Sequence, residues 1–372
     1  MKKAVSLILC FVFCLGITAY KTEAMGTSAE AHILVDADSG IILSQNNEHT
    51  KMKMASTTKL MTTLLCLEEA AKKDRVVTFS DAMIAEGSSM YLKTGDKVKL
   101  SDLAKGMMMA SGNDAANAVA LTLSKNFEDF ARLMNSRAKT IGMENTNFVT
   151  PSGLDDDNHY STAFDMSLLM AEALKNEAFC EISASKEEKV EFVYPEDKVS
   201  TYPNHNRLLK LYKYCTGGKT GYTKAAGRCL VSSARKDGVT LVAVTLNAPD
   251  DWNDHKALYE YGFSLYTQVK PDVNRVYNIK VSGGEEEFLT ASADEDKPLS
   301  VPADRIKDIE KTVYLPDFIF APVKKGSIVG KITYILDGKE LRTQYIKAQS
   351  FVNEKPQPNF FVRIINAIFS RE

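Results

Sequence analysis

Two strand-rich segments enclose a helix-rich segment in the first 270 residues of the chain, and this order restricts the fold most. Residues 31–45 contain two β-rich runs separated by Asp38-Ser39-Gly40, so a hairpin is expected there. Helical periodicity runs from near Ser56 to about Lys73 and returns in separate segments between residues 101 and 176. Residues 215–247 are again β-rich, with Asp237-Gly238 as a hairpin turn. Strands from both ends with helices between them predict one mixed sheet with helical material packed against it.

The chain changes character near residue 270, where alternating apolar and polar residues are interrupted by Gly, Pro and Asp turns. This pattern is typical of short strands, and 372 residues exceed what one compact core usually holds. We therefore expect an α/β (α+β) domain with a mixed sheet and a helical subdomain at residues 25–269. A small all-β domain is expected to follow at residues 270–352.

Both ends of the chain have the composition of targeting segments. Residues 1–24 combine a basic start, an apolar stretch too short for a comfortable membrane span and small residues ending at Ala24, which predicts a signal peptide; an uncleaved anchor is the alternative. Residues 353–372 have the periodicity of an amphipathic helix after Pro356 and Pro358. Its polar face holds Asn359, Arg363, Asn366 and Ser370. We expect this helix to lie in a membrane surface rather than against the protein's own core. The protein would then be exported and bound to the outer face of the cytoplasmic membrane.

Charge and cysteine content exclude two classes of site. The formal net charge of −2 gives no electrostatic reason to expect a nucleic-acid partner. Cys10 and Cys14 fall in the signal, and the other four cysteines show neither a C-x-x-C pair nor metal-ligand spacing. A Cys215–Cys229 disulfide is compatible with export, but the sequence does not establish it.

The stretch "MASTTKLM" places Ser56 three residues before Lys59, at the start of an apolar helix. Residues three apart share a helix face, so the hydroxyl and the amine can meet. A neutral lysine can take the proton of a nucleophilic serine, and burial beside another positive charge would lower the lysine pKa enough for that. The alternative is a serine that only caps the helix. S-x-x-K alone does not separate the two readings.

A second motif, "ASGND", places Ser111 and Asn113 at an interruption between two helical segments. Ser111 can relay a proton between Lys59 and a leaving amine, and Asn113 can hold a substrate amide. A loop with polar turn residues is the alternative for this motif alone.

The motif K-T-G occurs twice, in different contexts. Lys219, Thr220 and Gly221 follow a glycine pair and lead into a β-rich stretch. There Lys219 can hold a substrate carboxylate directly or through Thr220, and Gly221 lets a peptide approach the backbone. The copy at residues 93–95 precedes Asp96 and is expected to be a structural turn.

The order S-x-x-K, S-x-N, K-T-G is the set found in β-lactamases and penicillin-binding proteins. Within that β-lactamase/transpeptidase-like superfamily, the chain resembles the D-alanyl-D-alanine carboxypeptidases, the low-molecular-mass penicillin-binding proteins. The segments that carry the resemblance include "VDADSGIILSQN", "GSSMYLKTGDKV", "LAKGMMMASGNDAANAVA", "HYSTAFDMSLL" and "GGKTGYTKAAGRCLVSSA". The resemblance covers nearly the whole mature chain, and it implies a C-terminal β domain and an amphipathic anchor.

This resemblance implies a serine peptidase that removes the terminal D-alanine from peptidoglycan stem peptides ending in D-Ala-D-Ala and is acylated by β-lactams. Ser56 would be the nucleophile, Lys59 the base and Ser111 a proton relay. The substrate-binding residues would be Asn113, Lys219, Thr220, Gly221 and Tyr222. The backbone N–H groups of Ser56 and Tyr222 would hold the oxyanion. No metal or organic cofactor is implied.

Three segments depart from the family's pattern. Thr150-Pro151-Ser152-Gly153-Leu154 stands where relatives commonly read N-P-H-G-L, and Phe164 replaces an arginine. The segment "LNAPDDWNDH" lacks an arginine that many members use for the substrate carboxylate, and Trp252 and His255 lie there instead. None of these residues is the nucleophile or the base, so substrate affinity and preference are affected rather than the activity class.

Two alternatives use the same scaffold. A β-lactamase of class A would need a glutamate in an E-x-x-L-N loop, and the nearest text, "EALKN" at Glu172, has the wrong spacing. A non-catalytic cell-wall-binding protein would not need all three motifs intact. A transpeptidase is a variant of the first reading, because an acceptor amine and water compete for one acyl-enzyme.

Overall fold

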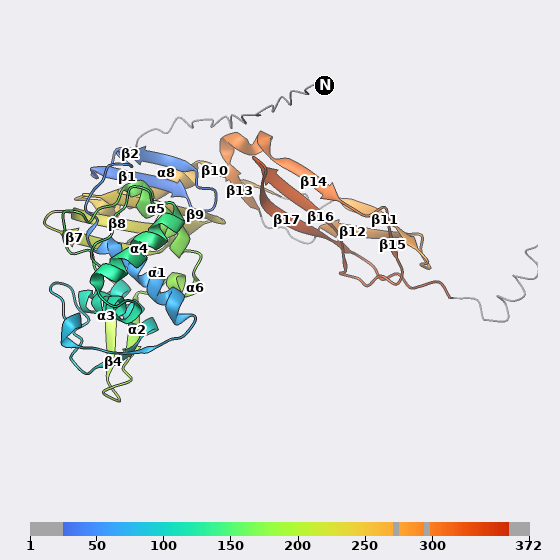
Figure 1. The fold of residues 1–372 in the computed structure, drawn as a ribbon. Coiled ribbons are helices and arrows are strands. Elements are labelled where there is room, and N and C mark those ends of the chain that lie inside the picture. Colours follow the sequence, from blue (N-terminus) through green and yellow to red (C-terminus); the bar gives the residue numbers. More distant parts are fainter. Residues whose placement is uncertain (1–24, 271–274, 294–297, 357–372) are drawn as a thin grey trace, which may run out of the picture. The chain divides into compact units, whose positions relative to one another are not determined.

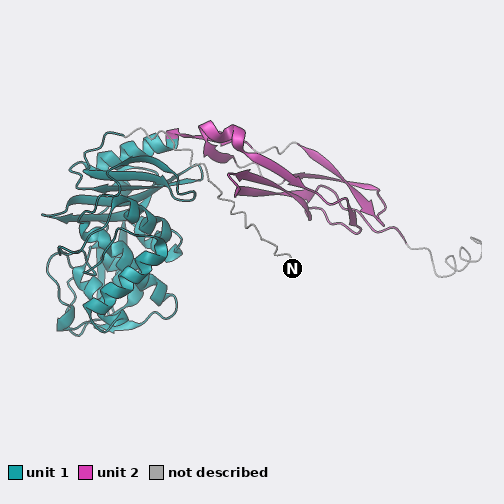
Figure 2. Cartoon of the chain, turned by 45° about the horizontal axis from the view of Figure 1, so that its top comes forward, with its two compact units in different colours: residues 1–263 teal, residues 264–372 magenta. Residues whose placement is uncertain are grey.

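The computed structural model describes residues 25–270, 275–293 and 298–356. The expected signal peptide and most of the expected membrane-surface helix lie outside these residues. The chain divides into two compact units, Met1–Phe263 and Ser264–Glu372, coloured teal and magenta in Figure 2. Among the described residues, no helix combines the length and apolar character needed to cross a membrane.

The first unit is built on a five-stranded sheet that combines strands from both ends of the unit (Figure 1). Its strand order is β2-β1-β9-β8-β7, so β7 is an edge strand. The strands are β1 (Ala31–Asp36), β2 (Ile42–Asn46), β7 (Cys215–Thr223), β8 (Gly227–Lys236) and β9 (Val239–Leu246). Each neighbouring pair is antiparallel. The expected fold class is confirmed, with a sheet that is antiparallel throughout rather than mixed in direction.

Helices cover both faces of this sheet. Alternate residues of a strand point to opposite faces, and every residue of β1 is buried, so both faces are covered. Ile33 and Val35 of β1 belong to the main helical core. Leu34, between them, points to the other face, where it lies against Gly262 of α8 (Asp251–Ser264). The remaining helices are η1 (Ala55–Thr58), α1 (Lys59–Ala70), η2 (Asp81–Met83), α2 (Leu100–Met109), α3 (Asn113–Leu123), α4 (Phe127–Ile141), α5 (Ala163–Ala173), α6 (Glu177–Ala184) and α7 (Leu208–Leu211).

Short hairpins and turns complete the first unit. Two two-stranded sheets pair β3 (Val76–Thr78) with β4 (Lys97–Lys99), and β5 (Glu187–Glu191) with β6 (Val199–Pro203). Asp237 and Gly238 both have positive φ and connect β8 to β9 directly, which confirms the expected two-residue hairpin turn.

The second unit is a β domain whose described residues also include one short 3-10 helix, η3 (Ala303–Asp308). Its six-stranded sheet has the order β14-β16-β17-β12-β11-β15, and β10 pairs with β13. The strands are β10 (Tyr266–Val269), β11 (Val276–Ser282), β12 (Phe288–Ala293), β13 (Leu299–Pro302), β14 (Glu310–Tyr314), β15 (Phe318–Phe320), β16 (Ile328–Leu336) and β17 (Lys339–Ala348). On β11, Tyr277, Ile279 and Val281 alternate with exposed residues and enter a separate core. The small all-β domain is confirmed.

Candidate active site

Ser56 and Lys59 meet at the junction of two helical segments. The 3-10 helix η1 runs directly into α1, which places the Ser56 hydroxyl one turn before the Lys59 amine. Lys59 Nζ lies 2.9 Å from Ser56 Oγ. Neither helix start has a side-chain cap bond. The contact that the i, i+3 spacing predicts is therefore present, and the capping alternative has no hydrogen bond to support it.

Lys59 is fully buried and has two further oxygen partners besides Ser56. Its Nζ lies 2.7 Å from Asn113 Oδ1 and 2.7 Å from the carbonyl oxygen of Ser152. Burial lowers the pKa of Lys59 well below its usual value, and the neighbouring Lys219 charge lowers it further, while Asp114 opposes the shift. A buried amine with a lowered pKa is available as a neutral base.

The geometry also defines where a neutral Lys59 amine would direct its lone pair. Amide and carbonyl oxygens can only accept hydrogen bonds, so Asn113 and Ser152 take the two N–H groups of a neutral amine. The remaining direction faces Ser56 Oγ. A serine hydroxyl can donate its proton there, so this arrangement suits transfer of a proton from Ser56 to Lys59.

Ser111 lies between α2 and α3, at the interruption that the sequence indicates. Its backbone has φ of 56°, an uncommon value for a residue with a side chain, and its hydroxyl lines the same cavity as Ser56. Asn113 begins α3, but both ends of its amide are engaged: Oδ1 accepts from Lys59, and Nδ2 donates to the Glu86 carbonyl at 2.7 Å. In this structure Asn113 orients Lys59, and its contact with substrate stays a prediction.

The departure at residues 150–154 does not disturb Lys59, because Ser152 contacts Lys59 Nζ through its backbone carbonyl, whatever its side chain. The adjacent Gly153 has φ of 84°, and a Cβ there would lie 1.9 Å from the Ala55 carbonyl oxygen. Only glycine allows this loop to approach η1 so closely.

His159 supports the same corner. The sequence places it in the segment "HYSTAFDMSLL" but assigns it no role. It is buried, and burial lowers its pKa to about 4, so its ring is neutral at pH 7. Its Nδ1 accepts from the backbone N–H groups of Val149 and Thr150 at 2.9 and 3.2 Å. The Nε2–H is then free to donate to Thr58 Oγ1, 2.8 Å away, in η1.

The K-T-G copy that the sequence predicts to be functional lies on the edge strand β7. Lys219 is buried, its pKa is lowered to about 7 by burial, and its Nζ donates to the Thr220 carbonyl at 2.8 Å. A Cβ on Gly221 would lie 2.9 Å from both Met54 O and Ser56 N. The missing side chain at Gly221 therefore lets β7 run against η1, beside the backbone of the serine.

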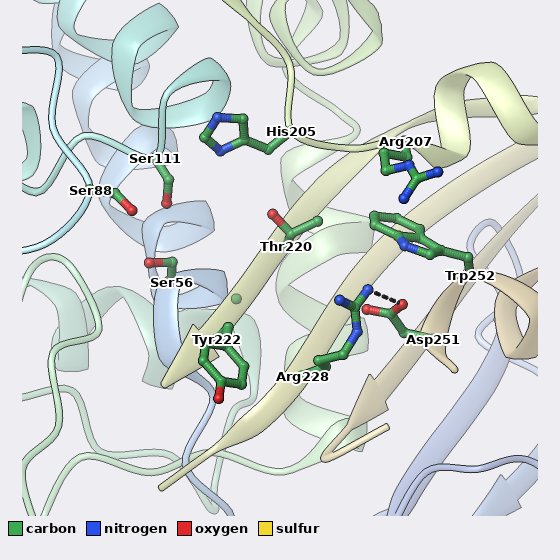
Figure 3. Close-up of a pocket in the computed structure, with 11 residues that line it drawn as sticks. Ser56, Ser88, Ser111, His205, Arg207, Thr220, Tyr222, Arg228, Asp251 and Trp252 are labelled. Atoms are coloured by element: carbon green, nitrogen blue, oxygen red, sulfur yellow. Dashed lines mark hydrogen bonds and ion pairs between the residues drawn. The ribbon is translucent and has the colours of Figure 1, made fainter. Parts of the chain in front are cut away.

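A cavity of about 400 Å³ opens along this edge (Figure 3). Of the predicted residues, Ser56, Ser111, Thr220, Gly221 and Tyr222 line it, whereas Lys59, Asn113 and Lys219 are buried behind it. The residues that the motifs did not identify are Ser88, His205, Arg207, Arg228, Asp251 and Trp252. Arg228 could have been inferred from the pairing of β7 with β8, because the register places Arg228 opposite Tyr222.

Other residues weighed from the sequence lie outside this cavity. The second K-T-G copy forms a turn in which the Lys93 N–H donates to Asp96, as expected of a structural segment. His255 is buried against the sheet, where it contacts Ser232 and Thr245, so only Trp252 of that pair reaches the cavity. Glu172 pairs with Arg137 and Lys175 instead of facing Ser56.

The four cysteines of the described chain, Cys66, Cys180, Cys215 and Cys229, are free thiols. In β7 and β8, Cys215 lies opposite Ala234 and Cys229 lies opposite Gly221, so the Cys215–Cys229 pair that the sequence left open does not form here. Burial raises the pKa of the Cys66 thiol, as expected of a small residue in the core.

Comparison with known proteins gives consistent results for both units. The family described as "D-alanyl-D-alanine carboxypeptidase" matches residues 18–250, and "Penicillin-binding protein 5, C-terminal domain" matches residues 266–354. D-alanyl-D-alanine carboxypeptidase DacC of Escherichia coli is 34% identical, over 95% of this chain and 92% of its own. The structure of D-alanyl-D-alanine carboxypeptidase DacD from Francisella tularensis has a TM-score of 0.62 at 28% identity, covering 90% of this chain and 96% of that one. A D-alanyl-D-alanine carboxypeptidase structure from Mycobacterium tuberculosis has a TM-score of 0.62 at 29% identity, covering 66% of this chain and 95% of that one.

Proposed function

This chain belongs to the D-alanyl-D-alanine carboxypeptidase family, and from that membership we propose that Ser56, Lys59 and Ser111 carry out the reaction of the family. The protein is a serine-type D-Ala-D-Ala carboxypeptidase. It removes the terminal D-alanine from peptidoglycan stem peptides through an acyl-enzyme, and β-lactams acylate it. What we propose is the assignment of these steps to individual residues.

The observation that supports the assignment best is the set of partners around Lys59. Asn113 and Ser152 accept two N–H groups, which leaves the lone pair of a neutral amine directed at Ser56 Oγ, 2.9 Å away. A lysine held for structure alone would be expected near a carboxylate. This one is fully buried beside a second lysine, Lys219, and both effects favour its neutral form.

Acylation begins when Ser56 Oγ attacks the carbonyl carbon of the penultimate D-alanine and its proton passes to Lys59 Nζ. The carbonyl electrons move onto oxygen, which accepts hydrogen bonds from the backbone N–H groups of Ser56 and Tyr222. Such preorganised donors typically contribute about 3 to 4 kcal/mol of transition-state stabilisation each. The Ser111 hydroxyl passes a proton to the leaving nitrogen as the C–N bond breaks, and Lys59 replaces that proton.

Deacylation reverses these roles with water as the nucleophile. Neutral Lys59 takes a proton from water as the water oxygen attacks the Ser56 ester, and Ser56 Oγ leaves with a proton returned from Lys59. Every proton is moved by a side chain of this protein.

A labelling experiment tests the assignment. The purified protein is incubated with fluorescent penicillin and, separately, with a peptide ending in D-Ala-D-Ala, beside the variant Ser56→Ala. We expect covalent labelling and D-alanine release by the unmutated protein and neither by the variant. Absence of both activities in the unmutated protein would refute the assignment, and rapid turnover of penicillin would indicate a β-lactamase instead.

We further propose that the protein is exported and held at the outer face of the cytoplasmic membrane. The support is the composition of residues 1–24 and the amphipathic pattern of residues 353–372. Flotation with anionic liposomes tests the second point: the full-length mature chain should float with the vesicles, and a chain lacking residues 356–372 should not. Flotation of the shortened chain would contradict the anchor.

A further inference from the structure

A carboxypeptidase must recognise the free carboxylate at the end of its substrate. Lys219 of the K-T-G motif is poorly placed for direct contact with that carboxylate. Lys219 is 1% exposed, does not line the cavity, and directs its Nζ to the Thr220 carbonyl. Lys59 is fully buried and engaged with Ser56. The cationic side chains that do line the cavity are Arg207 and Arg228.

Arg228 is fixed in the cavity by three separate contacts. The β7–β8 register sets it opposite Tyr222, one residue from the K-T-G motif. Its Nη2 forms an ion pair with Asp251 Oδ1 at 2.5 Å, and its guanidinium carbon lies 5.6 Å from the centre of the Trp252 ring. Figure 3 shows Thr220 between Ser56 and the Arg228–Asp251 pair in that view. Arg207, by contrast, is exposed and forms no ion pair within the described chain.

The Asp251 contact orients Arg228 without using up its donors. A guanidinium has five N–H groups, and Asp251 takes only the one on Nη2. The Nε–H is buried without a hydrogen-bond partner within the described residues, although the side chain as a whole is 41% exposed. Because Nε has almost no exposed surface, the donors left for a ligand are the N–H groups of Nη1 and Nη2 that Asp251 does not take. A carboxylate is the ligand whose two oxygens match two parallel N–H groups.

Charge in the cavity is consistent with an anionic ligand. Asp251 neutralises one guanidinium, and Arg207 adds a second positive charge that no lining carboxylate balances. A substrate carboxylate would therefore leave the cavity close to neutral.

We propose that Arg228, oriented by Asp251 and Trp252, binds the C-terminal carboxylate of the substrate beside Thr220. This assignment rests on the proposed function. Arg228 on β8 then provides the positive charge that the segment after β9 does not provide. Asp251 is a positioning residue here, because it acts through Arg228.

The test compares a diacyl-L-Lys-D-Ala-D-Ala peptide with the same peptide ending in a carboxamide. kcat/KM is measured on both for the unmutated protein, for Arg228→Gln and for Arg235→Gln. Arg235 is the matched control, since it is an exposed arginine on the same strand that does not line the cavity. We expect Arg228→Gln to lower kcat/KM on the free acid by about 10- to 100-fold, the usual effect of losing a hydrogen bond to a charged group. Its loss on the carboxamide should be smaller, so that the acid-to-amide preference falls, whereas Arg235→Gln should keep that preference.

Two further variants keep the test informative. If Arg228→Gln fails to fold because Asp251 is left unpaired, the double variant Arg228→Gln/Asp251→Asn removes both charges and should show the same lost preference. Asp251→Asn alone should lower the preference in part, which a purely structural role would not do. An unchanged acid-to-amide preference in folded Arg228→Gln, or in the double variant, would overturn the assignment of Arg228 and leave the proposed function intact. Cleavage of neither peptide by the unmutated protein would overturn the proposed function, and this assignment with it.

Discussion

Lys59 has oxygen partners from three parts of the chain, two of them distant in sequence. Ser56 is its neighbour in sequence, but Asn113 and Ser152 lie 54 and 93 residues further along. All three present oxygen atoms, and none carries a formal charge that would favour a protonated amine. Among charged neighbours, Lys219 has the larger effect on the Lys59 pKa and lowers it, while Asp114 opposes the shift. The buried pair of lysines therefore favours the neutral amine that a base requires.

The Lys59–Lys219 coupling predicts a change in the pH profile. Burial is the main cause of the lowered Lys59 pKa, and the Lys219 charge is the second. Acylation needs neutral Lys59, so its rate rises as pH rises through that pKa. Lys219→Met removes a positive charge that disfavours protonated Lys59, so the Lys59 pKa should rise and the ascending limb should move to higher pH. The measurement is the pH dependence of penicillin acylation.

Lys93→Met is the control for that prediction, because it alters the same motif in a structural turn. Its profile should match that of the unmutated protein. If Lys219→Met does not shift the ascending limb of the pH profile of acylation, the two amines are not coupled.

At the residue level, the sequence predicted what local spacing and known motifs determine. The Ser56–Lys59 contact follows from one helical turn, and the position of Ser111 follows from an interruption of helical pattern. Ser152 and His159 could not be identified in this way, and Arg228 could be identified only through the pairing of β7 with β8. Each makes a contact that the tertiary fold creates: a backbone carbonyl on Lys59, a neutral ring between a loop and η1, and a guanidinium paired with Asp251 of α8.

At the level of elements, the position of the nucleophile depends on how closely two backbones approach η1. The loop at Gly153 contacts the Ala55 carbonyl from one direction, and β7 at Gly221 lies against Ser56 N from another. Helix η1 is thus held between a loop and a strand edge, which explains how a short 3-10 segment can keep a reactive serine in one place.

Gly153→Ala should displace η1. The substitution combines a backbone with φ of 84° and a Cβ 1.9 Å from the Ala55 carbonyl oxygen, so we expect a destabilisation of about 3 kcal/mol or more together with slower penicillin acylation. Gly40→Ala is matched in backbone conformation, with φ of 76° in open space, and should cost only about 1 to 2 kcal/mol with no change in acylation. Chemical denaturation and acylation rates measure both effects. Equal losses of stability in the two variants would contradict the role assigned to Gly153.

The sequence predicted which segments form helices and strands where the periodicity was strong. It did not predict the relative direction of the paired strands. Alternation and turn residues located the β8–β9 hairpin correctly, because Asp-Gly turns have a local preference. The antiparallel pairing of β1 with β9 joins residues more than 200 positions apart. No local pattern specifies that pairing, since the packing of helices on both faces decides it.

The whole molecule consists of two units, each with its own core. The Mycobacterium tuberculosis structure matches 66% of this chain over 95% of its own chain, so that solved chain has little beyond the matched part. We expect a chain of residues 25–265 to fold and to be acylated by penicillin within about twofold of the full-length rate, as for independent sites. Thermal unfolding and acylation kinetics of the shortened chain measure this. A failure to fold, or a much slower acylation, would mean that the β domain supports the active site.

The most direct test of the account is the rate of Ser56 acylation by benzylpenicillin in Lys59→Ala, followed by intact mass, with near-ultraviolet circular dichroism to verify the fold. Lys93→Ala serves as the control. General-base catalysis typically contributes about 10²- to 10⁴-fold, so we predict a loss of that size in Lys59→Ala and none in Lys93→Ala. A folded Lys59→Ala protein that is acylated at the unmutated rate would contradict the assignment of Lys59 as the base.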